Sequence, residues 1–232
     1  MNGKHGYQIC KRLFDLFFAS AALLILSPLL LVIAVLVRLD SPGPVLYGAL
    51  RAGRYNVPFR MWKFRSMVVG ADSMGGLSVG KNDPRVTRVG RFLRRYKLDE
   101  LPQLLNVLKG EMSLVGPRPE FLKYAQQYEG EELLILSVPV GITDYASVAF
   151  IRMDELLGNG DPDGVYEEQI RPMKNALRVR YAQEQSFWVD LLILFSTLRC
   201  LAGVGDWDGL NAKPECEAEP HELAGEWHLS RR

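Results

Sequence analysis

The chain has 232 residues, a formal net charge of +1 and 48% hydrophobic residues. This length suits one domain of ordinary size with a core of its own. The near-zero net charge excludes recognition of a partner by overall charge alone, although basic residues cluster in the first half and acidic ones near the end. Cys10, Cys200 and Cys216 fit no metal or redox spacing, and we expect reduced thiols on the cytosolic side.

The first element is an apolar segment from Leu16 to Val37 without a charged residue. It is long enough to cross a bilayer and too long for a cleaved signal peptide. Pro28 near its middle removes a backbone hydrogen bond and bends the helix, and the Ser27 hydroxyl can satisfy the freed carbonyl. Basic residues flank both ends, so the positive-inside rule gives no crossing direction. The residues alone leave a kinked spanning helix and a re-entrant helix as alternatives.

A soluble body is expected after the turn signal Ser41-Pro42-Gly43-Pro44. Alternating apolar residues at 45–47 and 58–64 predict a short β-hairpin. Residues 70–84, rich in Gly, Ser and Asp, are typical of a mobile loop. The apolar spacing over 86–96 predicts a helix with one apolar face and arginines largely on the others.

These arginines, among them Arg94, lie shortly before residue 99. Planar guanidinium groups bind two phosphate oxygens at once, which suits a phosphate site. A nucleic-acid-binding module is the alternative, but the cluster is short, carries no recognition motif and follows a membrane segment. We therefore expect no nucleic acid among the partners.

Asp99 and Glu100 form an acidic pair shortly before Pro102. Proline fits the first turn of a helix, and leucines then recur at helical spacing until Gly110. The pattern therefore places both carboxylates at a helix N-terminus, whose unpaired amides favour ionised carboxylates and bound phosphates alike. Ordinary helix capping is the simpler interpretation of such a pair taken by itself.

A second motif favours a functional site over capping. Pro117 and Pro119 flank Arg118 and fix the backbone on either side of it, which holds the guanidinium in place. Together with an acidic pair, this arrangement predicts a phosphate clamp.

The last third of the chain predicts one helix and a tail. The apolar stretch 187–195 is interrupted by Asp190 and is too short to span a membrane. It is predicted to be a helix that lies either in the membrane interface or in the core. Beyond Asp206 the chain is acidic and loses its periodicity, which is typical of disorder.

These motifs, in this order, resemble those of the bacterial sugar transferases known as monotopic phosphoglycosyl transferases. The resemblance runs from about Lys11 to Leu201. The matching motifs are Ser27-Pro28, Ser41-Pro42-Gly43-Pro44-Val45, Lys63-Phe64-Arg65-Ser66-Met67, Asp83-Pro84-Arg85-Val86-Thr87-Arg88-Val89-Gly90, Leu98-Asp99-Glu100-Leu101-Pro102-Gln103-Leu104 with Asn106-Val107, and Ser113-Leu114-Val115-Gly116-Pro117-Arg118-Pro119.

The resemblance implies that a sugar 1-phosphate is moved from a nucleoside diphosphate sugar, usually a UDP-sugar, to a polyprenyl phosphate, with release of UMP. It implies that Asp99 is the nucleophile, which forms an aspartyl phosphosugar, and that Glu100 holds a catalytic Mg²⁺. The candidate phosphate- and nucleotide-binding residues are Lys63, Arg65, Arg94 and Arg118.

The resemblance also implies a fold: a predominantly helical α+β protein with a small β-hairpin and interfacial helices. The apolar segment is implied to be re-entrant and broken at Ser27-Pro28, which decides between the two alternatives above. We expect a membrane segment at 1–40, a catalytic domain at 41–205 and an acidic disordered tail at 206–232. The expected location is the cytoplasmic face of the bacterial inner membrane, with a homodimer as one possible assembly.

Two departures from the family pattern leave the sugar open. Ala49 stands where family members usually have glutamine, and residues 144–147 replace a Trp-containing stretch. Neither touches the acidic pair or the clamp. The competing enzyme hypothesis is a membrane-bound Mg²⁺-dependent phosphatase or pyrophosphatase, in which water replaces the lipid acceptor. A membrane-tethered scaffold without enzymatic activity is the other alternative.

Overall fold

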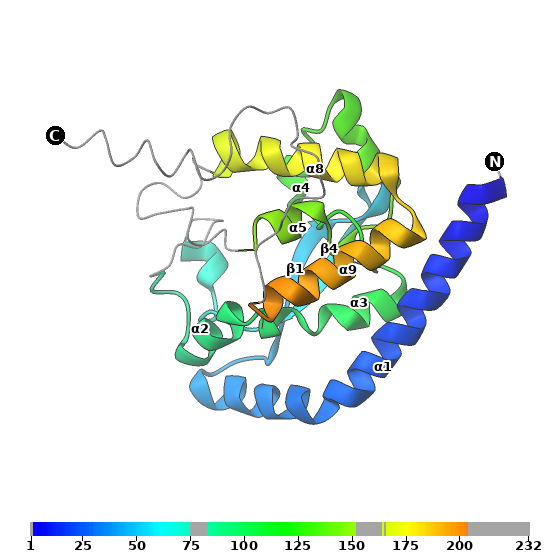
Figure 1. Cartoon of the computed structure of the whole chain (residues 1–232). Helices are drawn as coiled ribbons and strands as arrows, with labels where there is room; N and C mark the ends of the chain where they lie inside the picture. The colour runs from blue at the N-terminus through cyan, green and yellow to red at the C-terminus, as the bar shows by residue number, and fades with distance from the viewer. Residues whose placement is uncertain (1, 75–82, 152–163, 165, 204–232) are drawn as a thin grey trace.

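The computed structural model describes residues 2–74, 83–151, 164 and 166–203, and this part is mostly helical (Figure 1). The predicted tail at 206–232 lies outside the described residues, as does most of the predicted loop at 70–84. The helices and strands are α1 (Asn2–Asp40), β1 (Leu46–Ala52), β2 (Pro58–Phe64), α2 (Arg88–Arg95), α3 (Gln103–Lys109), β3 (Ser113–Val115), α4 (Leu122–Ala125), β4 (Gly141–Thr143), α5 (Tyr145–Ala149), α8 (Arg171–Glu184) and α9 (Phe187–Leu201).

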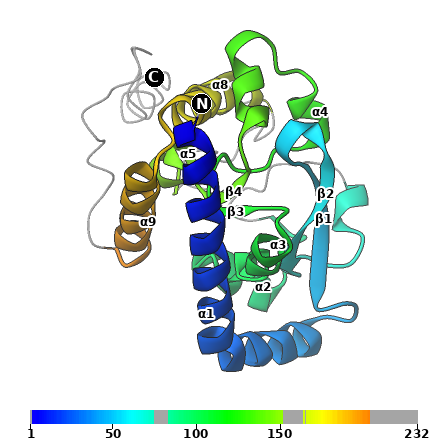
Figure 2. The ribbon, with the colours of Figure 1, turned by 90° about the vertical axis from the view of Figure 1, so that its right-hand side faces the viewer.

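Helix α1 is continuous but bent, and its two arms point in different directions (Figure 2). Pro28 lies inside it and has no amide hydrogen to give to the carbonyl of Leu24. The Ser27 hydroxyl donates to that carbonyl instead, at 2.8 Å. The predicted compensation by serine is thus confirmed, whereas the predicted break is a bend within one helix.

Most of α1 is apolar and exposed, with Leu24 and Ile25 more than three-quarters accessible. Within the described residues, Gly6–Asp40 is the one helix that is long and apolar enough to cross a membrane. Such a surface is unfavourable in water, which supports association of the protein with a membrane.

Both arms of α1 are attached to the folded body. In the first arm, Arg12 donates to two carbonyls at the end of α3, at 2.6 and 2.9 Å, and Asp15 accepts from the amide of Leu114 in β3 at 2.9 Å. In the second arm, Asp40 accepts from the amide of Val89 in α2 at 2.9 Å. The same body therefore holds the helix before and after its bend.

Strands β1 and β2 form the predicted hairpin. They pair antiparallel, with Tyr47 opposite Lys63 and Arg51 opposite Phe59. Alternate residues of a strand share a face, so these four side chains lie on the same face of the hairpin. That face is directed at the body, because its central residues are buried. The central residues are Ala49 and Met61.

Strands β3 and β4 form a short parallel pair that the sequence analysis did not predict. Gly116 follows β3 and packs against Gly141 of β4 with no room for a side chain. A Cβ atom on Gly141 would lie 2.1 Å from the backbone nitrogen of Gly116. This close backbone contact fixes the point from which the Pro117-Arg118-Pro119 segment begins.

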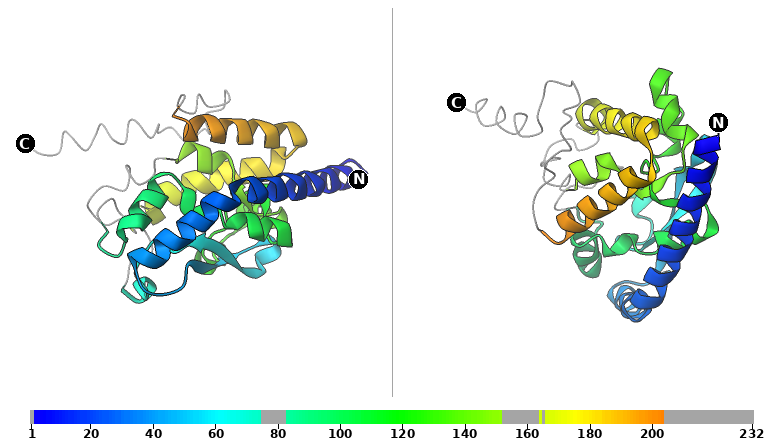
Figure 3. Two further views of the ribbon diagram at one scale, coloured as in Figure 1. Left: turned by 90° about the horizontal axis from the view of Figure 1, so that it is seen from below. Right: turned by 45° about the vertical axis from the view of Figure 1, so that its right-hand side comes forward.

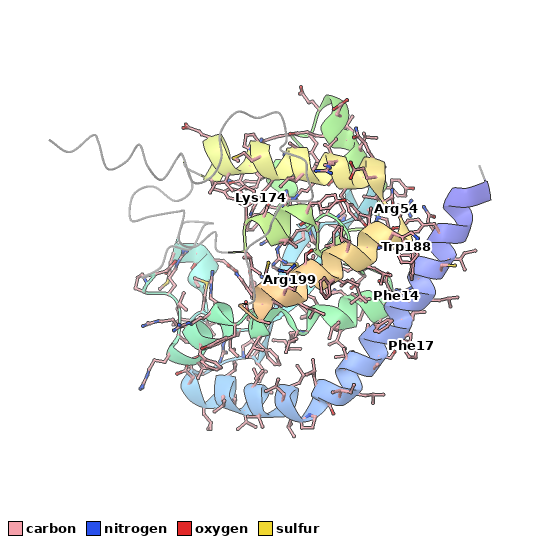
Figure 4. The ribbon with its side chains drawn as sticks, viewed as in Figure 1. Phe14, Phe17, Arg54, Lys174, Trp188 and Arg199 are labelled. Atoms are coloured by element: carbon pink, nitrogen blue, oxygen red, sulfur yellow. The ribbon has the colours of Figure 1, made fainter. Side chains whose placement is uncertain are left out.

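Helix α9 has one side in the core and one side exposed. The core position is confirmed for the buried side, and the position in a membrane interface stays a prediction. Ile193 is fully buried, whereas Trp188 and Phe195 are 78% and 63% exposed. The beginning of α9 lies beside the first arm of α1 (Figure 3), where Phe14 and Phe187 stack edge to face at 5.6 Å. Figure 4 shows Phe14, Phe17 and Trp188 along these two helices.

Candidate active site

The acidic pair lies in a 3-10 turn, Leu98–Glu100, that directly precedes α3. Lys97 enters this turn in the left-handed conformation, with φ of 55°. Pro102 then caps α3, and Gly110 ends it with φ of 83°. The predicted end of α3 at Gly110 is confirmed. The acidic pair lies one turn before the N-terminus of α3, because the regular α-helix begins at Pro102 and not at residue 99.

Asp99 is buried. Its residue surface is 6% exposed, and among the residues that the structure describes its carboxylate makes no hydrogen bond or ion pair. Burial raises the pKa of Asp99 and nearby Glu100 adds to this, while the charges of Lys63, Arg94 and Lys97 act to lower it. A carboxylate kept apart from donors in this way is available to react with an electrophile.

Glu100 is tethered by two cations. The amine of Lys63 donates to its Oε1 at 2.9 Å, and the guanidinium of Arg118 contacts the same oxygen. Burial acts to raise the pKa of Glu100, but the charges and hydrogen bonds of Arg118 and Lys63 outweigh it, so the pKa lies well below its usual range. Glu100 is therefore an anion at any physiological pH.

Lys63 is positioned by a buried amide. Asn106 is fully buried in α3, accepts a hydrogen bond from the amide of Trp62 at 3.0 Å and donates to the carbonyl of Arg60 at 2.7 Å. These two bonds fasten β2 to the helix that follows the acidic pair. Burial lowers the pKa of the Lys63 amine, although Glu100 opposes the shift.

Arg118 is positioned by Asp144, one of the residues at which the chain departs from the family pattern. The fully buried carboxylate of Asp144 accepts from the backbone amide of Arg118 at 3.1 Å and from the amide of Ser147 at 2.6 Å. The same carboxylate thus caps the N-terminus of α5 and holds the backbone of Arg118 in place. The prediction that residues 144–147 do not touch the clamp is therefore wrong, because folding joins two segments that are far apart in the chain.

Two further predicted phosphate ligands behave differently. Arg94 lies in the last turn of α2, and its charge acts on Asp99, while its role as a phosphate ligand stays a prediction. Arg65 is buried and donates to the carbonyls of three residues at the end of α1 and just beyond it. Both of its terminal nitrogens donate to backbone carbonyls, so we leave Arg65 out of the proposed phosphate site. The three carbonyls belong to Val37, Ser41 and Pro42.

A buried ion pair behind the clamp was also missed. Glu120 binds Arg178 of α8 at 3.0 Å and accepts from the hydroxyl of Tyr166 at 2.8 Å. Lys174 (labelled in Figure 4) lies nearby, and burial lowers its pKa to about 7. Glu120 directly follows Pro119, which is the one sequence feature that could have pointed to it.

Comparison with known proteins agrees with this geometry. The sequence pattern of the family described as bacterial sugar transferase matches residues 6–203. The chain belongs to the bacterial sugar transferase family.

Three relatives show how far the likeness extends. The UDP-glucose:undecaprenyl-phosphate glucose-1-phosphate transferase of Escherichia coli K12 is 40% identical over 195 residues, which cover 82% of this chain and 40% of that protein. The UDP-N-acetylgalactosamine-undecaprenyl-phosphate N-acetylgalactosaminephosphotransferase of Aeromonas hydrophila is 38% identical, over 86% of this chain and 45% of that protein. A Caulobacter vibrioides protein with the same name as the first is 36% identical, over 82% of this chain and 69% of its own length. The chain thus spans less than half of the first two relatives.

For this bacterial sugar transferase we predict that Arg118→Lys lowers turnover about ten- to hundredfold, as expected for the loss of one charge-assisted hydrogen bond. Lysine keeps the charge but cannot hold Glu100 and a phosphate oxygen at once. The measurement is the steady-state rate with a UDP-sugar and polyprenyl phosphate. Wild-type kinetics of Arg118→Lys would show that the segment around Arg118 is only a structural turn.

Proposed function

We propose that this protein transfers a sugar 1-phosphate from a UDP-sugar to a polyprenyl phosphate and releases UMP. The observation that carries the proposal is a buried Asp99, without a hydrogen bond or ion pair among the described residues, beside a Glu100 held by Lys63 and Arg118. The names of the related proteins, which specify undecaprenyl phosphate and UDP-sugars, support the substrate classes.

The proposed reaction has two steps at one phosphorus atom. An Asp99 carboxylate oxygen attacks the phosphorus that carries the sugar, and the bond from that phosphorus to the bridging oxygen breaks. UMP leaves with the bridging oxygen and its electron pair. A phosphate oxygen of the lipid then attacks the same phosphorus, the bond to Asp99 breaks, and the carboxylate is restored. A covalent intermediate lets one site serve a soluble donor and a lipid acceptor in turn.

Fixed cations make this attack feasible. A carboxylate approaching a diphosphate meets strong repulsion, which positive groups aimed at the phosphate oxygens reduce. Lys63 and Arg118 already converge on Glu100, and Arg94 acts on Asp99. The charges that act on Asp99 therefore include lysine and arginine groups, which suit phosphate.

The acidic pair also fits Mg²⁺. No group of three or more acidic, histidine or cysteine side chains suited to a metal occurs among the described residues. Mg²⁺ is commonly held by one or two carboxylates together with substrate phosphates, and Glu100, with Asp99 beside it, meets that requirement. When bound, the ion would neutralise charge on the phosphate oxygens.

We also propose that α1 is re-entrant, with both ends on the cytoplasmic face of the bacterial inner membrane. In one arm Arg12 donates hydrogen bonds to the folded body and Asp15 accepts one from it, and in the other arm Asp40 accepts one, so both arms are joined to the same body. A folded body cannot lie on both sides of a bilayer. The bend at Pro28 and the exposed apolar side of α9 agree with insertion into one leaflet.

The topology has a direct test. In a variant that lacks Cys10, Cys200 and Cys216, Lys4→Cys should be protected from a membrane-impermeant thiol reagent added from the periplasm. Adding Pro28→Leu restores the missing backbone donor, favours a straight helix and should expose the label site, with loss of activity. Periplasmic labelling without the Pro28 change would contradict the re-entrant arrangement.

The function is tested by measuring UMP release from a panel of UDP-sugars, with and without polyprenyl phosphate. We expect UMP and a lipid-linked sugar only from the complete mixture at steady state, with at most one UMP per protein when the lipid is absent. Multiple turnovers that yield free sugar phosphate without lipid would instead establish the phosphatase alternative. No UMP from any donor would contradict the proposal.

A further inference from the structure

Arg51 lies in β1 and is partly buried. Within the described residues it makes no hydrogen bond and no ion pair, and its Nη1 atom is buried without an acceptor. The remainder of the side chain is partly exposed, so a ligand can reach it. Burying a cation without a partner is costly, and such a group is expected to have a function.

The guanidinium of Arg51 is held in place by packing. It lies over the ring of Phe121, with 3.3 Å between its central carbon and the ring centroid. The next residue, Ala52, donates its amide hydrogen to the carbonyl of Glu120 at 2.9 Å. These contacts place Arg51 against the segment that continues directly from the clamp at Arg118.

No acidic side chain in the described part of the chain forms an ion pair with Arg51. Glu120 is the carboxylate that acts on it most strongly, but its oxygens are bound to Arg178, the hydroxyl of Tyr166 and the backbone amide of Phe121. Burial lowers the pKa of Arg51 to about 10, and the charge of Arg118 adds to that shift. Arg51 is therefore under the repulsion of Arg118 and has no ion-pair partner of its own among the described residues, whereas Arg118 is paired with Glu100.

The hairpin places Arg51 on the same side as the active site. Lys63 and Arg51 share one face of the hairpin, and the partner of Lys63 on β1 precedes Arg51 by four residues. Four residues of a strand span ~13 Å. Arg118 acts electrostatically on both residues and thus links them. This distance along the hairpin is too long for one phosphate to contact both residues. It suits a larger ligand, such as a nucleotide sugar or a lipid phosphate.

We propose that Arg51 binds a phosphate oxygen of a substrate, beside Arg118 and apart from the attacked phosphorus. Guanidinium suits this role because it offers paired donors in one plane. The inference rests on the proposed function. The phosphate is that of the UMP half of the donor or that of the lipid acceptor, and the experiment separates these sources.

The test measures ligand binding by the full-length protein in nanodiscs, without turnover. The probes are UMP and uridine for the donor, and undecaprenyl phosphate and undecaprenol for the acceptor. Arg51→Gln should weaken one phosphate ligand about ten- to hundredfold and leave its phosphate-free counterpart unchanged. Arg51→Lys should recover part of the loss.

The matched control is Arg54→Gln. Arg54 (labelled in Figure 4) lies in the same hairpin and donates to the carbonyl of Ser137 at 2.9 Å at an exposed site. This change removes the same charge and should leave all four affinities at wild-type values. Thermal unfolding of both variants reports whether the fold is intact.

The outcomes separate cleanly. Weaker UMP binding with normal uridine binding assigns Arg51 to the donor, and weaker undecaprenyl phosphate binding with normal undecaprenol binding assigns it to the acceptor. Unchanged affinities, or equal losses for a phosphate ligand and its counterpart, overturn the inference. If the wild-type protein neither binds UMP nor releases it from a UDP-sugar, the proposed function fails and this inference with it. If the wild-type protein is active and Arg51→Gln binds all ligands with the same affinities, only the inference about Arg51 is overturned.

Discussion

Asp99→Asn is expected to abolish turnover, lowering the rate by about four orders of magnitude or more, as is usual when an enzyme loses its nucleophile. The amide has nearly the shape of the carboxylate but cannot attack phosphorus. The readouts are UMP release and the intact mass of the protein after incubation with a UDP-sugar. Wild-type protein should gain the mass of one phosphosugar, and the variant should gain none.

The fold of the Asp99→Asn variant should be at least as stable as the wild type at neutral pH. Because burial raises the pKa of Asp99, its ionised form is disfavoured in the folded state, and a neutral amide removes that penalty. Glu131→Gln, which removes a charge at an exposed position, is the matched control and should keep wild-type activity. Substantial turnover by purified Asp99→Asn would exclude the nucleophile assignment.

The raised pKa also predicts the pH dependence of the first step. Attack requires the ionised carboxylate, so UMP release in the absence of lipid should fall as the pH drops through the pKa of Asp99. That fall should occur above the pH at which an ordinary aspartate titrates, because burial is the largest influence on this group. Glu100, whose pKa lies well below its usual range, should stay ionised throughout.

Glu100→Gln is expected to lower turnover about a hundred- to thousandfold, the usual cost of removing one strong charge-stabilising group. Glu100 compensates the charges of Lys63 and Arg118, and in our proposal it holds Mg²⁺. The amide keeps a hydrogen-bond acceptor but loses the charge. The rate should be measured as a function of Mg²⁺ concentration, and the variant should need more of the ion for half-maximal activity.

Two results would contradict this role. A near-normal rate with an unchanged Mg²⁺ requirement would exclude Glu100 as the metal ligand. An equal loss of activity at every Mg²⁺ concentration, together with a lower unfolding temperature, would mean that Glu100 only holds Lys63 and Arg118 together. Glu131→Gln again provides the control for loss of a carboxylate.

Several features of this protein follow from its sequence because they depend on neighbours in the chain. The apolar helix, the hairpin at β1 and β2, the end of α3 at Gly110 and the pairing of Ser27 with the carbonyl freed by Pro28 are set within a few residues. The acidic pair and the clamp could also be predicted, since proline acts on the residues beside it.

Other features required the tertiary structure. The parallel pair of β3 and β4 joins segments more than twenty residues apart and rests on close contact between Gly116 and Gly141. The assignment of Arg65 to backbone carbonyls depends on where α1 ends relative to β2. Contacts with cations decided the contrast between the pKa of Asp99 and that of Glu100: burial acts to raise both, but Lys63 and Arg118 form ion pairs with Glu100.

The sequence by itself determined which residues carry charge near the site, and only the tertiary structure decided which charges are neutralised. Asp144 accepts a hydrogen bond from the backbone amide of Arg118, Glu120 is paired with Arg178, and Glu100 is paired with both Lys63 and Arg118. Arg51 is left without an acceptor among the described residues. The reason is physical: the strength of a charge interaction depends on distance and burial, and both are set by the packing of segments far apart in the chain.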